Sequence, residues 1–293
     1  GSHARAFVDI HGPCAPSMGW RVVDAAHALA HAVAMGATEF TGAKTLDFPA
    51  IVGIGGSLIY FIDQYGAANP YSDFNFIGPA KPKGVGFHYL DHLTHNVHRG
   101  NMDKWFDFYG KIFGFKQIRF FDIEGKFTGL FSRALTSPCG RIRIPINEDR
   151  GETGQIVEYL RRYNGEGIQH IALATDNIFE TVEEMKRRGI PFQDTIETYF
   201  DLIDKRLPNH GEDVARMRLN RILIDGSDED GLLLQIFTQD TFGPIFFEII
   251  QRKGNQAFGE GNFQALFDSI RSEERRVGKE CVTWCRSRWS PYH

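Results

Sequence analysis

Tyr89–Val97, with the sequence YLDHLTHNV, is the stretch that decides the fold of this chain. Its residues alternate in polarity, which predicts a strand with His92 and Thr94 on one face and His95 on the other. An amphipathic helix is predicted at Asp103–Phe113, where apolar residues recur at helical spacing. Three more strands are predicted after this helix: Lys116–Asp122, Thr128–Ala134 and Arg141–Ile146. Together these elements form one strand–helix–three-strand module, or βαβββ module.

The same order of elements returns later in the chain. A helix at Glu152–Tyr163 leads to a predicted strand at Ile168–Ala174, and a helix at Ile178–Arg188 follows. Three predicted strands complete this module: Arg221–Asp225, Leu232–Thr238 and Ile245–Gln251. Repetition with a period of about 60–80 residues indicates duplicated modules rather than a solenoid. Paired βαβββ modules can curl their sheets into an open barrel around a cavity, so we expect an α+β fold of this kind.

A further module is predicted ahead of a linker. Its elements are a strand at Met18–Val23, a helix at Asp24–Met35 and short strands, of which Ser57–Ile62 is the clearest. Gly78–Gly86 (GPAKPKGVG) is rich in Pro, Gly and Lys and predicts a domain boundary. We therefore expect an N-terminal domain at residues 1–80, without a module before Met18, and a C-terminal domain of two modules and a final helix at residues 81–270. Gly1–His3 is either a tag remnant or native sequence.

Composition and charge argue against several classes of protein. The net charge of −4 disfavours a nucleic-acid partner, although residues 271–293 form a basic tail of odd composition. No apolar run approaches the roughly 18 residues of a spanning helix, and we expect no secretion signal because no charged-then-apolar leader opens the chain. The low count of four cysteines fits a reducing cytoplasm. The 25 phenylalanines are enough to line an apolar cavity or to fill a core.

Two histidines and one glutamate are candidates for chemistry. His92 and His170 lie at matching places in the opening strands of two modules, and the same number of residues separates His170 from Glu248. Glu248 lies in the apolar stretch IFFEII, where a carboxylate is costly unless it is paired or binds a metal. Two histidines and a carboxylate form a ligand set that leaves positions open on Fe(II) for substrate and O2. The alternative interpretation is structural, with core histidines and a salt-bridged glutamate.

Other polar and aromatic residues lie on or after the apolar strands. Gln235 and Phe237 alternate onto one face of their predicted strand, and Asn147 follows the strand that ends at Ile146. Phe258–Phe263 (FGEGNF) precedes a final predicted helix. No strand leads into its glycines in the way that a nucleotide-binding loop requires, so we do not interpret this run as one.

Taken together, these stretches resemble the 4-hydroxyphenylpyruvate dioxygenase family, which has the vicinal oxygen chelate fold. The resemblance runs approximately from Val8 to Ile270. It is carried by six stretches: Asp91–Val97 (DHLTHNV), Ile144–Glu148 (IPINE), Gly165–Ala172 (GEGIQHIA), Leu233–Phe237 (LLQIF), Phe246–Arg252 (FFEIIQR) and Gly259–Phe263 (GEGNF). Their combination, more than any one of them, makes the resemblance specific.

The resemblance implies an Fe(II)-dependent dioxygenase that converts 4-hydroxyphenylpyruvate and O2 to homogentisate and CO2 in tyrosine and phenylalanine catabolism. It implies that His92, His170 and Glu248 bind Fe(II). It places five polar residues around the substrate: Ser132, Asn147, Gln155, Gln169 and Gln235. It assigns the wall and lid of an aromatic pocket to Pro145, Phe237, Phe246, Phe258, Gly259, Asn262 and Phe263. No external 2-oxoglutarate is needed, because the substrate is itself a 2-oxo acid.

Two alternatives stay open at this point. One is 4-hydroxymandelate synthase, which has the same fold, ligands and substrate but oxidises the benzylic carbon, and the other is a metal-free ligand-binding member of the fold. As partners we expect 4-hydroxyphenylpyruvate, O2 and further copies of the chain in a dimer or tetramer, with neither nucleic acid nor a membrane. The family normally carries a module before Met18, so we expect exposed apolar surface and low stability. Residues 271–293 do not resemble the end of the family; we interpret them as a cloning or assembly artefact and assign them no function.

Overall fold

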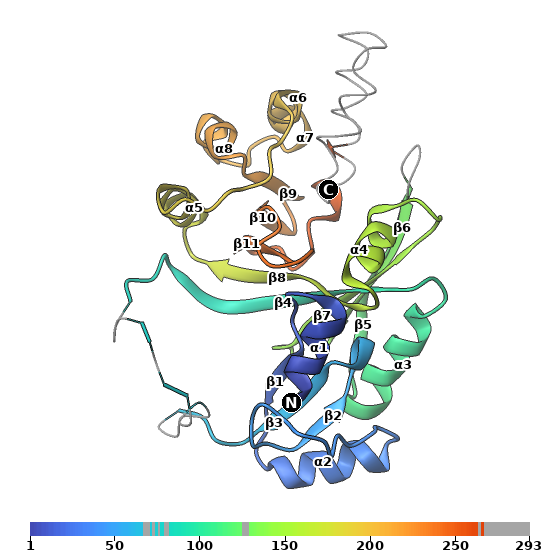
Figure 1. Ribbon diagram of the computed structural model, residues 1–293. Helices are drawn as coiled ribbons and strands as arrows, with labels where there is room; N and C mark the ends of the chain where they lie inside the picture. The colour runs from blue at the N-terminus through green and yellow to red at the C-terminus, as the bar shows by residue number, and fades with distance from the viewer. Residues whose placement is uncertain are drawn as a thin grey trace.

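The computed structural model describes residues 1–66, 71, 74–75, 77–78, 82–124, 129–262 and 265–266, with only the backbone at 123–124. This part of the chain is an α+β fold with a three-stranded sheet and an eight-stranded sheet (Figure 1). The tail at residues 271–293 and Phe263 of the predicted pocket lie outside the described residues. Among the helices that are described, none is long and apolar enough to cross a bilayer.

The eight-stranded sheet contains two complete modules. Its strands are β4 (Phe87–Val97), β5 (Lys116–Glu124), β6 (Gly129–Thr136), β7 (Arg143–Asp149), β8 (Gly167–Thr175), β9 (Leu223–Ser227), β10 (Gly231–Phe237) and β11 (Phe246–Lys253). Their order is β5-β6-β7-β4-β8-β11-β10-β9, so the first strand of each module lies beside the last strand of the same module. Those neighbours are parallel, and the modules meet where β4 and β8 pair antiparallel. The predicted α+β fold of duplicated βαβββ modules is confirmed.

Each module carries a long helix between its first and second strands. These are α3 (Met102–Phe113) and α5 (Ile178–Arg187), and α4 (Gln155–Tyr163) joins the two modules. The Asn177 side chain caps α5 by accepting a hydrogen bond from the backbone N–H of Glu180. Three short helices that the sequence patterns do not predict follow α5: α6 (Glu197–Asp201), α7 (Ile203–Arg206) and α8 (Val214–Asn220).

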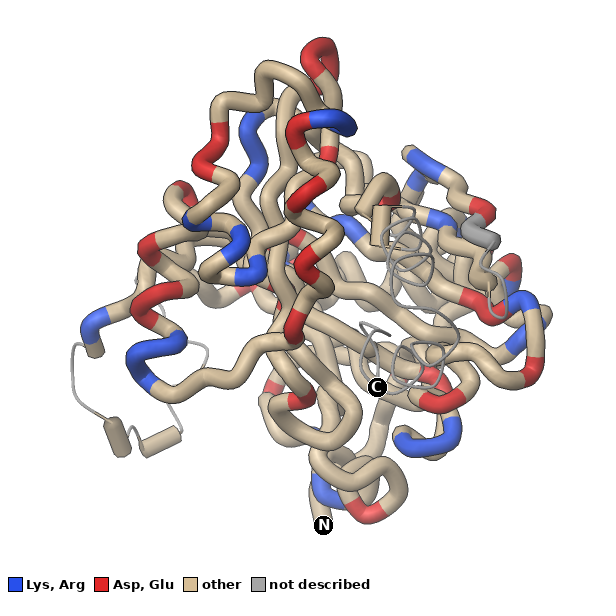
Figure 2. Tube along the Cα trace, turned by 90° about the horizontal axis from the view of Figure 1, so that it is seen from above, with Lys and Arg blue, Asp and Glu red and all other residues tan. Residues whose placement is uncertain are grey.

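Charged residues of both signs are interspersed along the described chain (Figure 2). On the outer helices they pair, as between Arg216 of α8 and Glu183 of α5, whose closest atoms are 2.8 Å apart. Arg218 of α8 likewise lies 2.7 Å from Asp201 of α6. These partly exposed pairs connect the outer helices, but each contributes little stability because water screens the charges.

The unit ahead of the linker packs onto the first complete module. Its elements are α1 (His3–His11), β1 (Ser17–Arg21), α2 (Ala25–Ala34), β2 (Ala50–Val52), the 3-10 helix η1 (Ile54–Gly56) and β3 (Leu58–Ile62), and its sheet has the order β1-β3-β2. Trp20 of β1 lies against Phe113 and Phe115, with ring centroids 4.6 and 5.6 Å apart, respectively. This shared core fixes the first unit beside α3, as Figure 1 shows.

Helix α1 is absent from the predicted elements. Its Phe7 and His11 are buried, and the ring of His11 stacks on that of Tyr163 of α4 with centroids 4.7 Å apart. Nδ1 of His11 also lies 2.8 Å from the backbone oxygen of Tyr163. The helix is therefore held by a contact that is very distant in sequence, which local periodicity does not reveal.

Candidate metal centre

Three neighbouring strands bring the two histidines and the glutamate together. In the large sheet, His92 of β4 pairs with Ala172 of β8, and Ala172 pairs with Glu248 of β11. His170 lies two residues before Ala172, so both side chains leave the same face of β8. The three candidate ligands therefore project from one face of the sheet, and the small methyl group of Ala172 leaves space between them.

The candidate ligands converge on one another. Oε2 of Glu248 lies 3.1 Å from Nε2 of His92 and 3.4 Å from Nε2 of His170. All three residues are nearly fully buried, with exposed fractions of 2% for His92, 6% for His170 and 2% for Glu248. Among the described residues, they are the one group of three or more His, Cys, Asp or Glu side chains whose ligand atoms all lie within 4.8 Å of one another.

The other ring nitrogen of each histidine is already engaged. Nδ1 of His92 lies 2.8 Å from Oδ1 of Asp91, and Nδ1 of His170 lies 2.9 Å from Oε1 of Gln169. Because both oxygens accept, each Nδ1 carries the proton and each Nε2 presents a lone pair. Oε1 of Glu248 is buried and has no hydrogen-bond partner among the residues that the structure describes. Two imidazole lone pairs and an unsatisfied carboxylate oxygen fit a divalent transition metal such as Fe(II).

The electrostatics of the site favour an ionised glutamate. Burial opposes ionisation, but His92 and His170 outweigh it through charge and hydrogen bonds and lower the pKa of Glu248 to about 2. Burial lowers the pKa of His170, whereas the charge of Glu248 and the hydrogen bond to Asp91 overcome burial and raise the pKa of His92. The carboxylates of Asp91 and Glu248 therefore favour positive charge at this site, which a bound divalent cation would supply.

The candidate ligands open into a pocket whose empty space, counted together with the open solvent at its mouth, is about 480 Å³. Its lining consists of His92, Thr94, Phe121, Leu130, Ser132, Pro145, Asn147, His170, Phe237, Glu248, Phe258 and Glu260. Five of these are predicted substrate residues: Ser132, Pro145, Asn147, Phe237 and Phe258. Ser132 of β6 pairs with both Phe121 of β5 and Asn147 of β7, so these three side chains lie in one row across the sheet. Apolar walls with a few polar groups suit an aromatic ligand that carries polar substituents.

Six other described residues of the predicted substrate set lie outside the cavity lining, and Gln155, Gln169 and Phe246 are three of them. Gln155 is the half-buried first residue of α4, and Gln169 turns toward Nδ1 of His170. Phe246 stacks on the ring of His170, with centroids 5.0 Å apart. Gln169 and Phe246 thus contact a candidate ligand, whereas Gln155 lies on the helix that joins the two modules.

The C-terminal segment closes one side of the cavity through Phe258. Gly259 follows with a left-handed φ of +77°, and a Cβ atom there would collide with the side-chain amide of Gln235. Gln235, 1% exposed, therefore lies beneath the segment and outside the residues that line the cavity, and its place beside the substrate stays a prediction. Asn262 also lies outside the lining, where its side chain accepts a 2.7 Å hydrogen bond from the hydroxyl of Tyr199.

Four lining residues are missing from the predicted set: Thr94, Phe121, Leu130 and Glu260. Strand alternation contains the signal for the first three. Thr94 lies two residues after His92, Leu130 lies two residues before Ser132, and each pair shares one face of its strand. Glu260 comes from a non-repetitive segment, and no periodic pattern indicates its direction.

His95 faces away from the candidate ligands, as the alternation predicts. Its Nε2 lies 2.8 Å from the hydroxyl of Tyr109 of α3, and both residues are fully buried. Burial lowers the pKa of His95 to about 3, so the ring is neutral. His95 therefore belongs to the core between β4 and α3 and is not a third histidine ligand.

Two family models match this chain on either side of the predicted linker. Residues 1–77 match the model described as "Hydroxyphenylpyruvate dioxygenase, HPPD, N-terminal". Residues 89–202 match the model described as "Glyoxalase/Bleomycin resistance protein/Dioxygenase superfamily".

Curated relatives cover most of the chain. A protein named hemolysin VllY from Vibrio vulnificus is 55% identical over 94% of this chain and 80% of its own. A 4-hydroxyphenylpyruvate dioxygenase from Pseudomonas aeruginosa is 52% identical over 94% of this chain and 79% of its own. Among solved structures, a triple mutant of 4-hydroxymandelate synthase from Streptomyces coelicolor is 25% identical, with a TM-score of 0.74 over 92% of this chain and 79% of that one. The chain belongs to the 4-hydroxyphenylpyruvate dioxygenase family.

Proposed function

We propose that this chain is an Fe(II)-dependent dioxygenase that converts 4-hydroxyphenylpyruvate and O2 to homogentisate and CO2. The observation that carries the proposal is the buried group of His92, His170 and Glu248 at the end of a cavity with aromatic walls. Family membership supports the same reaction, because relatives with this name share about half of their residues with this chain over nearly all of its length. The reaction places the chain in tyrosine and phenylalanine catabolism.

Fe(II) suits the donor set of two imidazoles and one carboxylate, which leaves coordination positions open. When bound, it supplies the redox chemistry and the open positions that a 2-oxo acid and O2 require. The protein contributes the charge and the proton positions. Glu248 brings one negative charge into a buried site, and the contacts of Asp91 and Gln169 keep the two Nε2 atoms free to bind a metal.

The cavity walls define the place of the aromatic ring. Phe237, Phe258 and Pro145 offer apolar contacts that exclude water from the reacting atoms. Ser132 and Asn147 are the neutral polar residues in the row opposite the C-terminal segment, and we assign them to hydrogen bonds with the substrate's oxygen atoms. Together they orient a ligand that has one apolar ring and polar groups at both ends.

A second product is the main alternative. The similarity to 4-hydroxymandelate synthase in fold makes 4-hydroxymandelate the competing outcome from the same substrate. That similarity is 25% in sequence, against 52% for the Pseudomonas dioxygenase, so homogentisate is the better supported product.

We also propose the division into a first domain at residues 1–80 and a catalytic domain at residues 81–270. The two family models support this boundary, because the first ends at residue 77 and the second begins at residue 89. We further propose that the protein acts in the cytoplasm and assembles into a dimer or tetramer. The two described cysteines, Cys14 and Cys139, are both free, which fits a reducing compartment. Light scattering of the purified protein measures the assembly directly.

The activity is tested by loading the protein anaerobically with Fe(II) and adding 4-hydroxyphenylpyruvate and air. We expect one O2 consumed for each CO2 released, without added 2-oxoglutarate. Glu248→Gln keeps the size of the side chain but loses the charge, so we expect it to lose iron and activity while its circular dichroism stays unchanged. The matched control is Glu183→Gln on α5, outside the cavity lining, which should keep both. Full turnover by Glu248→Gln would exclude the proposed ligand set.

A further inference from the structure

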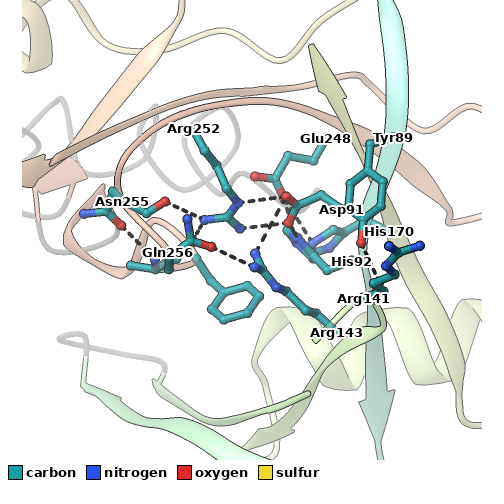
Figure 3. Close-up of polar contacts among 12 residues, drawn as sticks. Tyr89, Asp91, His92, Arg141, Arg143, His170, Glu248, Arg252, Asn255 and Gln256 are labelled. Atoms are coloured by element: carbon teal, nitrogen blue, oxygen red, sulfur yellow. Dashed lines mark hydrogen bonds and ion pairs between the residues drawn. The ribbon is translucent and has the colours of Figure 1, made fainter. Parts of the chain in front are cut away.

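A buried ionic cluster lies directly behind His92. The Asp91 carboxylate, whose residue is 3% exposed, receives two hydrogen bonds from Arg252, from Nε at 2.7 Å and from Nη2 at 2.8 Å. The same carboxylate faces Nδ1 of His92 at 2.8 Å. Nη1 of Arg143 lies 3.9 Å from it (Figure 3).

Arg252 also holds the chain that leads to the cavity wall. Its Nη1 donates to the backbone oxygens of Asn255, at 3.1 Å, and Ala257, at 2.6 Å. The next residue is Phe258, whose ring lines the cavity and packs edge-on against the ring of His92 with centroids 5.2 Å apart. The guanidinium group of Arg252 thus connects the segment 255–258 with the carboxylate behind His92 (Figure 3). Arg143 makes a second and longer link, because its Nη2 donates to Oε1 of Gln256 at 2.7 Å while its Nη1 lies 3.9 Å from the carboxylate.

A register shift makes this connection possible. Between Leu90 and His92, β4 advances two residues while β8 advances one, so Asp91 is an extra residue in the pairing. In a regular strand, Asp91 and His92 would point to opposite faces. The shift bends the strand and lets the carboxylate of Asp91 turn to the edge of the His92 ring.

We infer that Arg252 is a positioning residue that couples the segment 255–258 to His92, so that metal binding and the observed position of this segment strengthen each other. The inference rests on the proposed metal site. Metal binding at Nε2 needs a fixed His92 ring with its proton on Nδ1, which Asp91 provides. Asp91 in turn is fixed by the same guanidinium that binds the two carbonyls. Moving the segment removes two acceptors from the partly buried guanidinium group of Arg252 and weakens the constraint that this group places on the Asp91 carboxylate. The coupling must act equally in both directions.

The other histidine offers an internal comparison. Nδ1 of His170 faces the neutral amide of Gln169, and among the described residues no hydrogen bond joins Gln169 to residues 254–262. The coupling therefore acts through one ligand, His92, and not through the metal site as a whole.

The test uses amide hydrogen exchange of the full chain with and without Co(II), which needs no turnover. In the wild-type protein, Co(II) should slow exchange in both β4 and residues 255–258. In Arg252→Gln, Co(II) should still slow exchange in β4 but no longer in residues 255–258. Its affinity for Co(II) should fall about tenfold, as for other residues that orient metal ligands.

Arg119→Gln is the matched control. Nη1 of Arg119 lies 3.5 Å from Oε1 of Glu260, so this arginine also contacts the C-terminal segment but does not touch Asp91. It should keep the wild-type response to Co(II). If Arg252→Gln does not fold, Arg252→Lys is the test variant instead, because lysine keeps the positive charge beside Asp91 but lacks the forked geometry of the guanidinium group. It should likewise lose the protection of residues 255–258.

Equal Co(II)-dependent protection of residues 255–258 in the wild type and in a folded Arg252 variant would overturn the coupling. A loss of this protection in Arg119→Gln as complete as in Arg252→Gln would overturn it as well. A Co(II) response as predicted, in a protein that makes no homogentisate when loaded with Fe(II), would support the coupling and reject the proposed reaction. Absence of Co(II) binding by the wild-type protein would reject both.

Discussion

Asp91 and Gln169 occupy equivalent positions in the two halves of the large sheet, and each faces Nδ1 of the histidine that follows it, at 2.8 and 2.9 Å. Both are extra residues at register shifts between β4 and β8. Duplication of the module has therefore preserved the geometry behind each candidate ligand, while the chemistry differs. His92 has an anionic partner and His170 a neutral one.

This difference predicts unequal effects of removing the two partners. Asp91→Asn takes away a charge-assisted hydrogen bond, so metal affinity should fall about 10–100-fold. Gln169→Met removes a neutral hydrogen bond at similar volume, and the loss should be several times smaller. Titration of both apoproteins with Co(II) measures the two constants. Equal losses would show that the charge of Asp91 does not strengthen His92 as a ligand.

His92→Ala and His95→Ala should separate metal binding from stability. His92→Ala removes a candidate ligand and should abolish stoichiometric iron binding. His95→Ala leaves the Tyr109 hydroxyl without its partner and opens a cavity in the core, which together cost about 2–4 kcal/mol of unfolding free energy. Iron content should survive in that variant. Iron analysis and urea unfolding of both proteins check the division, and iron loss in His95→Ala under conditions where it stays folded would contradict it.

His95 also predicts part of the pH dependence of stability. Burial lowers its pKa from 6.5 to about 3, so the unfolded chain takes up a proton in this range and the folded protein does not. The stability that this residue contributes is complete above pH 6.5 and declines as the pH falls toward 3. His95→Gln should remove that decline, about 1.4 kcal/mol per pH unit once the pH is below 6.5. Urea unfolding of both proteins between pH 7 and pH 4.5 is the measurement, and parallel curves would rule out this assignment.

Ala172 predicts a steric requirement of the site. It lies between His92 and Glu248 in the paired strands and is fully buried. Ala172→Leu should push the candidate ligands apart, lower metal affinity by more than tenfold and cost about 1–3 kcal/mol of stability. Ala174→Leu, two residues farther along β8, is the control and should keep the metal. Unchanged Co(II) affinity in Ala172→Leu would mean that the metal does not lie on this face of the sheet.

Ser132→Ala tests the proposed place of the substrate. Loss of one hydrogen-bonding hydroxyl should raise the KM for 4-hydroxyphenylpyruvate several-fold and leave iron content unchanged. Ser137→Ala, at the turn after β6 and outside the cavity lining, is the matched control. An unchanged KM in Ser132→Ala would remove Ser132 from the substrate site.

The repeated modules were predictable from the sequence because their strands alternate and their helices have helical spacing with clear ends. Helix α1 was not, since its burial depends on Tyr163 of α4. The short helices α6, α7 and α8 are only four to seven residues long, too short for periodicity to identify. Their cores form only when α5 and β9–β11 are in place.

The three candidate ligands could be predicted because each lies on a strand, where alternation tells to which face of the sheet a side chain points. The contact between Asp91 and His92 could not be predicted in this way, because alternation places neighbouring residues on opposite faces. Only the register shift turns the Asp91 side chain toward the His92 ring. Gln235 shares a face of the sheet with Phe237, as alternation predicts. The contact between its side-chain amide and Gly259 is long-range and leaves no local pattern in the sequence.

The most direct test of the proposed reaction is the identity of the product. The Fe(II)-loaded protein is supplied with 4-hydroxyphenylpyruvate and 18O-labelled O2. The products are separated by chromatography, and mass spectrometry measures their molecular masses. We predict homogentisate that carries label from O2, together with an equal amount of CO2, and no product from Glu248→Gln. Labelled 4-hydroxymandelate as the main product, or homogentisate from Glu248→Gln at the wild-type rate, would contradict it.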